Sequence, residues 1–98
     1  MDFKIIWSAP AIESLGEIVR PIAQDNPDAA RREGQQLVAR VEITTRFPEI
    51  GPIYAHARPL EILSLVDSKY LIYYRVQHVT HTIEILAVRH GARQPPGF

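Results

Sequence analysis

The residues best suited to chemistry in this 98-residue chain lie near its C-terminus, where two arginines flank a histidine in the run Arg89-His90-Gly91-Ala92-Arg93. An imidazole titrates near neutral pH, so it can accept or donate a proton. A guanidinium group binds carboxylates and phosphates through two parallel hydrogen bonds. Two earlier arginines, inside or beside predicted strands, can support the same contact. The predicted target-binding residues are Arg58, Arg75, Arg89, His90 and Arg93.

One reaction that these residues could catalyse is RNA cleavage. Without a metal it needs a base for the 2′-hydroxyl, an acid for the leaving oxygen and cations for the crowded phosphate. The corresponding nuclease set would be Arg58, Arg75, His90 and Arg93. However, the chain has only two lysines, and the only aromatic residue after the last predicted strand is Phe98, which has no transferable proton. We therefore favour a protein-binding role, for which no catalytic residue is expected.

Each of these residues also has a purely structural interpretation. Arg75 lies among apolar residues of a strand, where it can pair with Glu61 or Glu84 on a neighbouring strand. His90 can be a strand-end residue whose ring bonds to the backbone. Tyr73 belongs to the core by its spacing, and its alternative role is to stack a nucleic-acid base on a free sheet face. The sequence leaves both interpretations of each residue open.

Metal and cofactor chemistry has little support in the sequence. The chain has no Cys, so it offers no thiolate ligand, no disulfide and no Cys nucleophile. His78 and His81 resemble half of a ligand set, and His56 and His90 are the other two histidines, but no Cys or obvious carboxylate accompanies them. The five glycines are scattered rather than gathered into a phosphate-binding loop. We expect neither a metal nor a cofactor.

The first half of the chain predicts one strand and two helices. Residues 3–7 form a short β-type run, and Ser8 is the expected N-cap of a helix with apolar residues at spacings of three and four. Pro21 interrupts this pattern and predicts a kink, or a helix that ends near Val19. A second helix is predicted from Pro27 to about Phe47, antiparallel to the first. Its buried stripe should contain Ala30, Gly34, Leu37, Val41, Thr44 and Phe47.

The second half of the chain predicts three strands, over Leu60–Val66, Tyr70–Val76 and Thr82–Val88, with turns at Asp67-Ser68 and at residues 78–81. Alternation places Tyr70, Ile72, Tyr74 and Val76 on one face of the second strand, and Ile83, Ile85 and Ala87 on one face of the third. The predicted order is β-α-α-β-β-β. This is a single α+β domain over residues 1–98, with a helical hairpin packed on one face of a mostly antiparallel sheet.

Composition narrows the possible partners. The chain is 46% hydrophobic and 22% charged, which is typical of a globular protein, and it contains no apolar run long enough for a membrane span. Eleven basic residues balance eleven acidic ones, whereas proteins that grip a long nucleic-acid backbone carry a basic excess. We therefore expect a cytoplasmic protein without sequence-specific nucleic-acid binding.

Segments spread over nearly the whole chain resemble one protein family in combination, although none of them is diagnostic alone. The segments are Ile6-Trp7-Ser8, residues 25–30, Phe47-Pro48 with Gly51, Arg58-Pro59-Leu60, residues 70–76 and residues 83–95. Together they resemble toxins of the RelE/ParE superfamily from type II toxin–antitoxin modules, historically called plasmid stabilisation proteins. The order of elements in that superfamily agrees with the order predicted above.

This resemblance implies a toxin that inhibits bacterial growth and is neutralised by a cognate antitoxin. RelE-like members cleave mRNA on the ribosome, whereas ParE-like members poison DNA gyrase. The ending His90-Gly91-Ala92-Arg93, followed by Pro95, is more similar to the ParE-like branch or to the uncharacterised plasmid-stabilisation branch. The resemblance therefore implies gyrase as the target, with a ribosome-dependent endoribonuclease or a non-toxic antitoxin-binding homologue as alternatives. We expect the antitoxin to fill an exposed apolar groove or to add a strand to the sheet.

Overall fold

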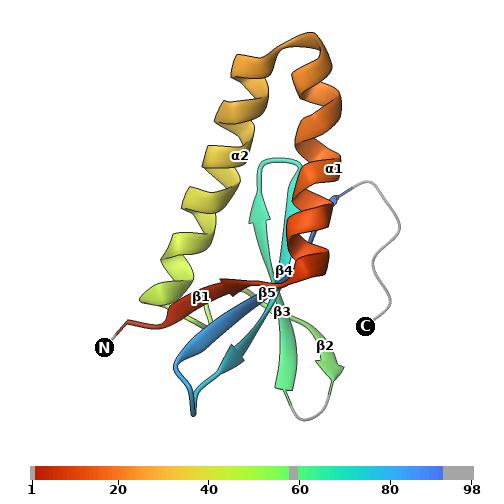
Figure 1. The fold of residues 1–98 in the computed structure, drawn as a ribbon. Helices are drawn as coiled ribbons and strands as arrows, with labels where there is room; N and C mark the ends of the chain where they lie inside the picture. Colours follow the sequence, from red (N-terminus) through yellow and green to blue (C-terminus); the bar gives the residue numbers. More distant parts are fainter. Residues whose placement is uncertain (1, 58–59, 92–98) are drawn as a thin grey trace.

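The computed structural model describes residues 2–57 and 60–91, with the side chains of 55–57 and 60 left aside. Two antiparallel helices cover one face of a five-stranded sheet with strand order β1-β5-β4-β3-β2 (Figure 1). The elements are β1 Lys4–Trp7, α1 Ala9–Asp25, α2 Pro27–Val41, the 3-10 helix η1 Glu42–Thr45, β2 Ile53–Ala57, β3 Leu60–Asp67, β4 Tyr70–Gln77 and β5 Thr82–His90. The predicted α+β class and the helical hairpin on one face of the sheet are confirmed.

The sheet contains one strand that the sequence did not predict. β2 pairs antiparallel with β3 at the edge of the sheet. Its five residues lie between Pro52 and Pro59, and a short run between prolines is typical of a loop. This segment is a strand because it pairs with β3, and that pairing cannot be predicted from the local sequence. β1 pairs parallel with β5, and the other pairs are antiparallel.

Two polar side chains fix the beginning of each helix. Ser8 Oγ accepts the Ala11 N–H at 3.2 Å, so Ser8 is the predicted N-cap of α1. Asn26 Oδ1 accepts the Ala29 N–H at 3.1 Å at the start of α2, while the Asn26 N–H donates to Ile22 O at 2.8 Å. Asn26 therefore closes α1 and opens α2, which makes the turn between the helices one residue long.

α1 continues past Pro21, so the predicted end near Val19 is wrong. Proline removes the N–H that would bond to the carbonyl four residues earlier, here that of Glu17. Both Pro21 and Glu17 are exposed, so water can satisfy that carbonyl. The helix keeps its packing on the sheet and on α2, and it ends only at Asp25.

α2 ends at Val41, six residues before the predicted end at Phe47, and one 3-10 turn follows it. Residues 43–45 are all β-branched, which disfavours the α-helix. Thr44 and Thr45 donate their hydroxyls to the carbonyls of Val41 and Glu42, both at 2.7 Å. Phe47 is 58% exposed and not part of the buried stripe. Ala30, Leu37, Val41 and Thr44 are buried as predicted, and Gly34 is partly buried.

The main core lies between the helices and the sheet face that they cover, here called the helix face. Its buried residues on β4 are Tyr70, Ile72, Tyr74 and Val76, as the alternation predicts. The opposite face, here called the open face, has a small cluster of three buried residues, Ile62, Tyr73 and Ala87. The buried Tyr74 hydroxyl accepts the Gly51 N–H at 3.0 Å, which attaches the segment before β2 to the core.

A β-bulge in β5 changes the faces on which its last residues lie. Tyr73 is opposite Ala87 and Tyr74 is opposite Ile85, so Leu86 is an additional residue in β5. Ile83 and Ile85 lie on the helix face as predicted, but Ala87 lies on the open face and Val88 on the helix face. The predicted face of Ala87 is therefore wrong, because strict alternation assumes a strand without a bulge.

Candidate functional site

The last two residues of β5 are both predicted site residues. Their register assigns them to different faces of the sheet, although both side chains line the hollow beside α1. Arg89 is opposite Leu71, which packs on the open-face cluster, and His90 is opposite Tyr70 of the helix face. Directly opposed residues of an antiparallel pair share a face. Without the bulge at Leu86, these two assignments would be exchanged.

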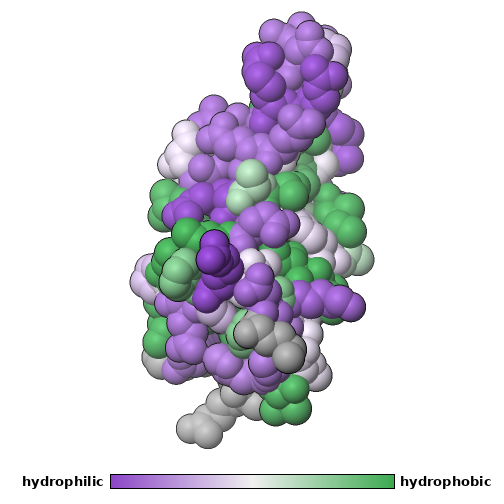
Figure 2. Space-filling view, turned by 90° about the vertical axis from the view of Figure 1, so that its left-hand side faces the viewer, coloured by the Kyte–Doolittle hydropathy of each residue, from purple (hydrophilic) through white to green (hydrophobic). Residues whose placement is uncertain are grey.

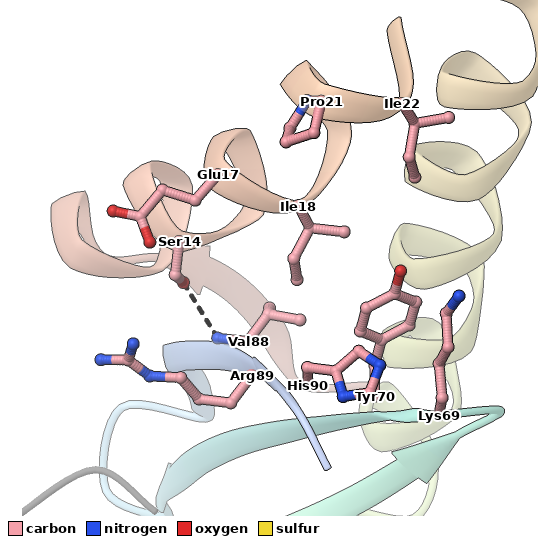
Figure 3. A pocket seen from close by; sticks show the side chains of 10 residues that line it. All are labelled: Ser14, Glu17, Ile18, Pro21, Ile22, Lys69, Tyr70, Val88, Arg89 and His90. Atoms are coloured by element: carbon pink, nitrogen blue, oxygen red, sulfur yellow. Dashed lines mark hydrogen bonds between the residues drawn. The ribbon is translucent and has the colours of Figure 1, made fainter. Parts of the chain in front are cut away.

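His90 lies in a group of titratable side chains at the end of the sheet (Figure 3). Its ring meets the buried Tyr70 ring edge-on at 5.7 Å between centroids, and Lys69 Nζ lies 5.6 Å from the Tyr70 centroid. The Gly91 N–H donates to Lys69 O at 2.7 Å and thereby joins this end of β5 to the β3–β4 turn. A hollow of about 200 Å³ adjoins the group, and Glu17 lies on its α1 side.

The Tyr70 hydroxyl is a proton donor rather than a base at neutral pH. Burial raises the pKa of Tyr70 above its usual value of 10.0, and the nearby Glu33 carboxylate raises it further. Lys69 and Tyr70 were not among the predicted site residues. Tyr70 meets His90, and Lys69 lies near the Tyr70 ring. The signal in the sequence was the short turn at residues 78–81, which brings the end of β5 back beside the start of β4.

Arg75 has the structural role that the sequence offered as its alternative. Its Nη2 lies 3.0 Å from Glu84 Oε1, directly across the β4–β5 pair on the open face. The two side chains are 31% and 29% exposed, so the pair is partly shielded from water. The predicted pairing with Glu84 is confirmed, and much of the Arg75 charge is neutralised within the chain.

Arg89 differs from Arg75 because the described part of the chain provides no ion-pair partner for it. Within the described residues, the Nε atoms of Arg89 and Arg75 are both buried without a hydrogen-bond partner, but only Arg75 has an ion pair through Nη2. The charge of Arg89 acts on the open-face cluster, where burial raises the pKa of Tyr73 and the Arg89 guanidinium partly offsets this increase. Tyr73 is 1% exposed and meets the Tyr54 ring edge-on at 4.7 Å, so no base can stack on it.

The structure brings Arg89 and His90 together around the hollow beside α1, but Arg75 does not line it. Arg75 and His90 lie on opposite faces of the sheet. Arg75 and Arg89 share the open face, but Arg89 is opposite Leu71, four residues or about 13 Å along β4 from Arg75. The other two predicted residues, Arg58 and Arg93, lie outside the described residues.

The paired histidines of the β4–β5 turn contact other side chains. His78 Nε2 lies 3.2 Å from Glu49 Oε1, and the Phe3 ring stacks on His81 at 4.9 Å. Among the side chains that the structure describes, which do not include that of His56, no three His, Asp or Glu gather where they could hold a metal ion. The described helices include none that is long and apolar enough to cross a membrane.

An apolar groove of about 560 Å³ lies between α1 and α2. Its lining includes Leu15 and Val19 of α1 and Ala30, Gly34 and Val38 of α2. The face that lies on the left in Figure 1 has green apolar patches below the purple, hydrophilic tip of the hairpin (Figure 2). An exposed apolar groove is therefore present, but it lies between the two helices, whereas the sequence placed it on a face of the sheet.

Comparison with known proteins identifies relatives along nearly the whole chain. The family model described as "ParE toxin of type II toxin-antitoxin system, parDE" matches residues 5–95. The curated protein "Putative toxin Y4kP" of Sinorhizobium fredii is 34% identical over 98 aligned residues, which cover 95% of this chain and 93% of that protein.

Two solved structures share the fold. The chromosomal ParDE toxin–antitoxin system of Pseudomonas aeruginosa includes a chain that aligns with a TM-score of 0.70 and 18% identity, covering 90% of this chain and 95% of that one. The RelBE2 toxin–antitoxin complex of Mycobacterium tuberculosis gives a TM-score of 0.60 and 19% identity, with coverage of 92% and 99%.

Proposed function

The chain belongs to the ParE toxin family of type II toxin–antitoxin systems, and we propose that it arrests bacterial growth by poisoning DNA gyrase in the cytoplasm. The observation that carries this proposal is the position of Arg75 and His90 on opposite faces of the sheet. Concerted acid–base cleavage of RNA needs its cations and its proton-transfer group around one phosphate. A toxin that acts by protein contact needs only accessible residues on a rigid scaffold.

Arg89 is the described residue that fits this contact best. It lies at the end of β5, next to the open-face cluster, and the described part of the chain provides no ion-pair partner for it. An unpaired guanidinium gains more from a carboxylate on a partner than one that is already bonded. Arg89 therefore leads the proposed target contact, and Arg75 supports it.

We also propose that a cognate antitoxin neutralises this toxin. The two related structures are toxin–antitoxin complexes, and the hairpin groove is apolar and open to solvent. An amphipathic helix is the partner element that fits such a groove. Co-expression of the chain with its cognate antitoxin should restore growth and yield a complex that survives purification.

The proposal is tested by pulse-labelling bacteria just after the chain is induced without an antitoxin. Gyrase poisoning predicts early loss of thymidine incorporation, with methionine incorporation falling later. Arg89→Ala should delay the loss, whereas Arg75→Ala should change it little. Immediate loss of methionine incorporation would instead indicate the ribosome and contradict the proposal. Unchanged incorporation of both labels would indicate a non-toxic homologue.

A further inference from the structure

We propose that Ser14 of α1 is a positioning residue that fixes the bulged register of β5, and so determines that Arg89 is paired with Leu71 of the open face and His90 with Tyr70 of the helix face. The proposal begins with the edge of β5. β1 pairs with β5 only as far as Trp7 and Ile85, and the Ser8 N–H donates to Ile85 O at 3.1 Å. Beyond this point β1 has turned into α1 and offers no further backbone acceptor.

Ser14 replaces the missing strand partner. The buried Ser14 hydroxyl accepts the Val88 N–H at 2.9 Å, across 74 residues of sequence (Figure 3). The same Oγ donates to Ala11 O at 3.0 Å. A hydroxyl has one proton, so its bond to the Ala11 carbonyl orients the oxygen lone pairs toward Val88.

The position of this bond makes it sensitive to register. Leu86 is the additional residue of the bulge, and Val88 follows it by two residues. The bulge therefore determines which backbone N–H of β5 points toward α1. In this structure it is the Val88 N–H, which donates to Ser14 Oγ. If the bulge were lost, β5 would slip by one residue, the Val88 amide would leave Ser14, and Arg89 and His90 would exchange faces.

The same α-helical layer provides a matched control. Thr44 is also a buried hydroxyl that donates to the carbonyl three residues earlier, that of Val41, at 2.7 Å. No hydrogen bond from Thr44 to β5 is found in the described part of the chain. Thr44→Val and Ser14→Ala each remove one buried hydroxyl and one local bond, but only Ser14→Ala removes the bond to β5.

The test uses the full-length chain, made by cell-free synthesis and studied by NMR. In Ser14→Ala, the Val88 amide should exchange with solvent about tenfold faster or more, because a buried donor is left without its acceptor. The ring-to-ring NOE between His90 and Tyr70 should weaken strongly. Thr44→Val should change neither signal, and Ser14→Thr, which keeps the hydroxyl, should restore both.

Ser14→Ala with wild-type Val88 exchange and an intact His90–Tyr70 NOE would overturn the proposal. If Ser14→Ala does not fold, the wild-type chain still decides, because a fast-exchanging Val88 amide would also overturn it. The biological consequence rests on the proposed function. If Arg89 contacts the target, Ser14→Ala should lower growth inhibition at least tenfold, and Thr44→Val should not. A fully toxic Arg89→Ala variant would refute the proposed contact of Arg89 with the target. The Val88 exchange rate and the His90–Tyr70 NOE would still test whether Ser14 fixes the register of β5.

Discussion

The two faces of the sheet differ in how much they bury and in how they use charge. The helix-face core comprises twelve buried residues from both helices and three strands, whereas the open-face cluster has three. The Arg75–Glu84 pair and Arg89 both belong to the open face. We conclude that the helix face provides most of the stability, and that the open face is free to carry charged residues for contact with a partner.

The most severe test of this difference removes one isoleucine from each face. Ile72 is fully buried on the helix face, and Ile62 is 2% exposed on the open face. We expect Ile72→Ala to lower the free energy of unfolding by about 3–5 kcal/mol and Ile62→Ala by about 2 kcal/mol, because the small cluster collapses more easily around a cavity. Urea denaturation measures both values. Equal losses would contradict the division of roles.

Two glycines test how tightly the layers are joined. A Cβ on Gly51 would overlap the Ser64 carbonyl and press on the Tyr74 hydroxyl, whereas a Cβ on Gly34 would only touch Val19. We expect Gly51→Ala to destabilise the fold by about 2–3 kcal/mol. Gly34→Ala should stabilise it by about 0.5–1 kcal/mol, because alanine favours the helix interior. Thermal unfolding should show a lower Tm for Gly51→Ala and a higher Tm for Gly34→Ala than for the wild type.

Alkaline pH should destabilise both faces through their tyrosines. Burial raises the pKa of Tyr70 and Tyr74 on the helix face and of Tyr73 on the open face above 10.0. Above pH 10 the unfolded chain loses these protons before the folded chain does, so stability is complete below pH 10 and is lost as the pH rises further. Tyr73→Phe should make the free energy of unfolding less dependent on pH above pH 10. The free energy of unfolding across this pH range provides the measurement, and a slope identical to wild type would contradict it.

The smallest effect is expected for the open-face ion pair. Arg75 and Glu84 are each about one-third exposed, so solvent screens their attraction. A double-mutant cycle with Arg75→Ala and Glu84→Ala should give a coupling of about 0.5–1 kcal/mol that shrinks at high salt. A coupling unaffected by salt would show that the contact is not mainly electrostatic.

The sequence predicted most of the helix face, because burial there follows regular periodicity. The spacing of Leu37 and Val41 and the alternation of Ile72 and Tyr74 each matched the core. Predictions failed where a local signal was overridden by distant pairing. Pro21 was accommodated in an exposed turn of α1, and β2 exists only through its pairing with β3.

The site was harder to predict than the fold because its geometry depends on one bulge. The residue types at positions 89 and 90 were recognised from the sequence, but the faces on which they lie depend on the additional residue Leu86. Lys69 and Tyr70 enter the site only through the register of β4 and β5. The Arg75–Glu84 pair was foreseen because cross-strand charge pairing is a general rule, although the sequence also allowed Glu61 as the partner.

The most direct test of the central claim is a DNA-cleavage assay with purified gyrase and the full-length chain. Our account predicts that the chain accumulates gyrase-cleaved DNA. Arg89→Ala should need at least tenfold more toxin for the same effect, whereas Arg75→Ala should stay within about threefold of wild type. Absence of cleaved DNA with the active wild-type toxin, or equal losses for the two arginine variants, would contradict the account.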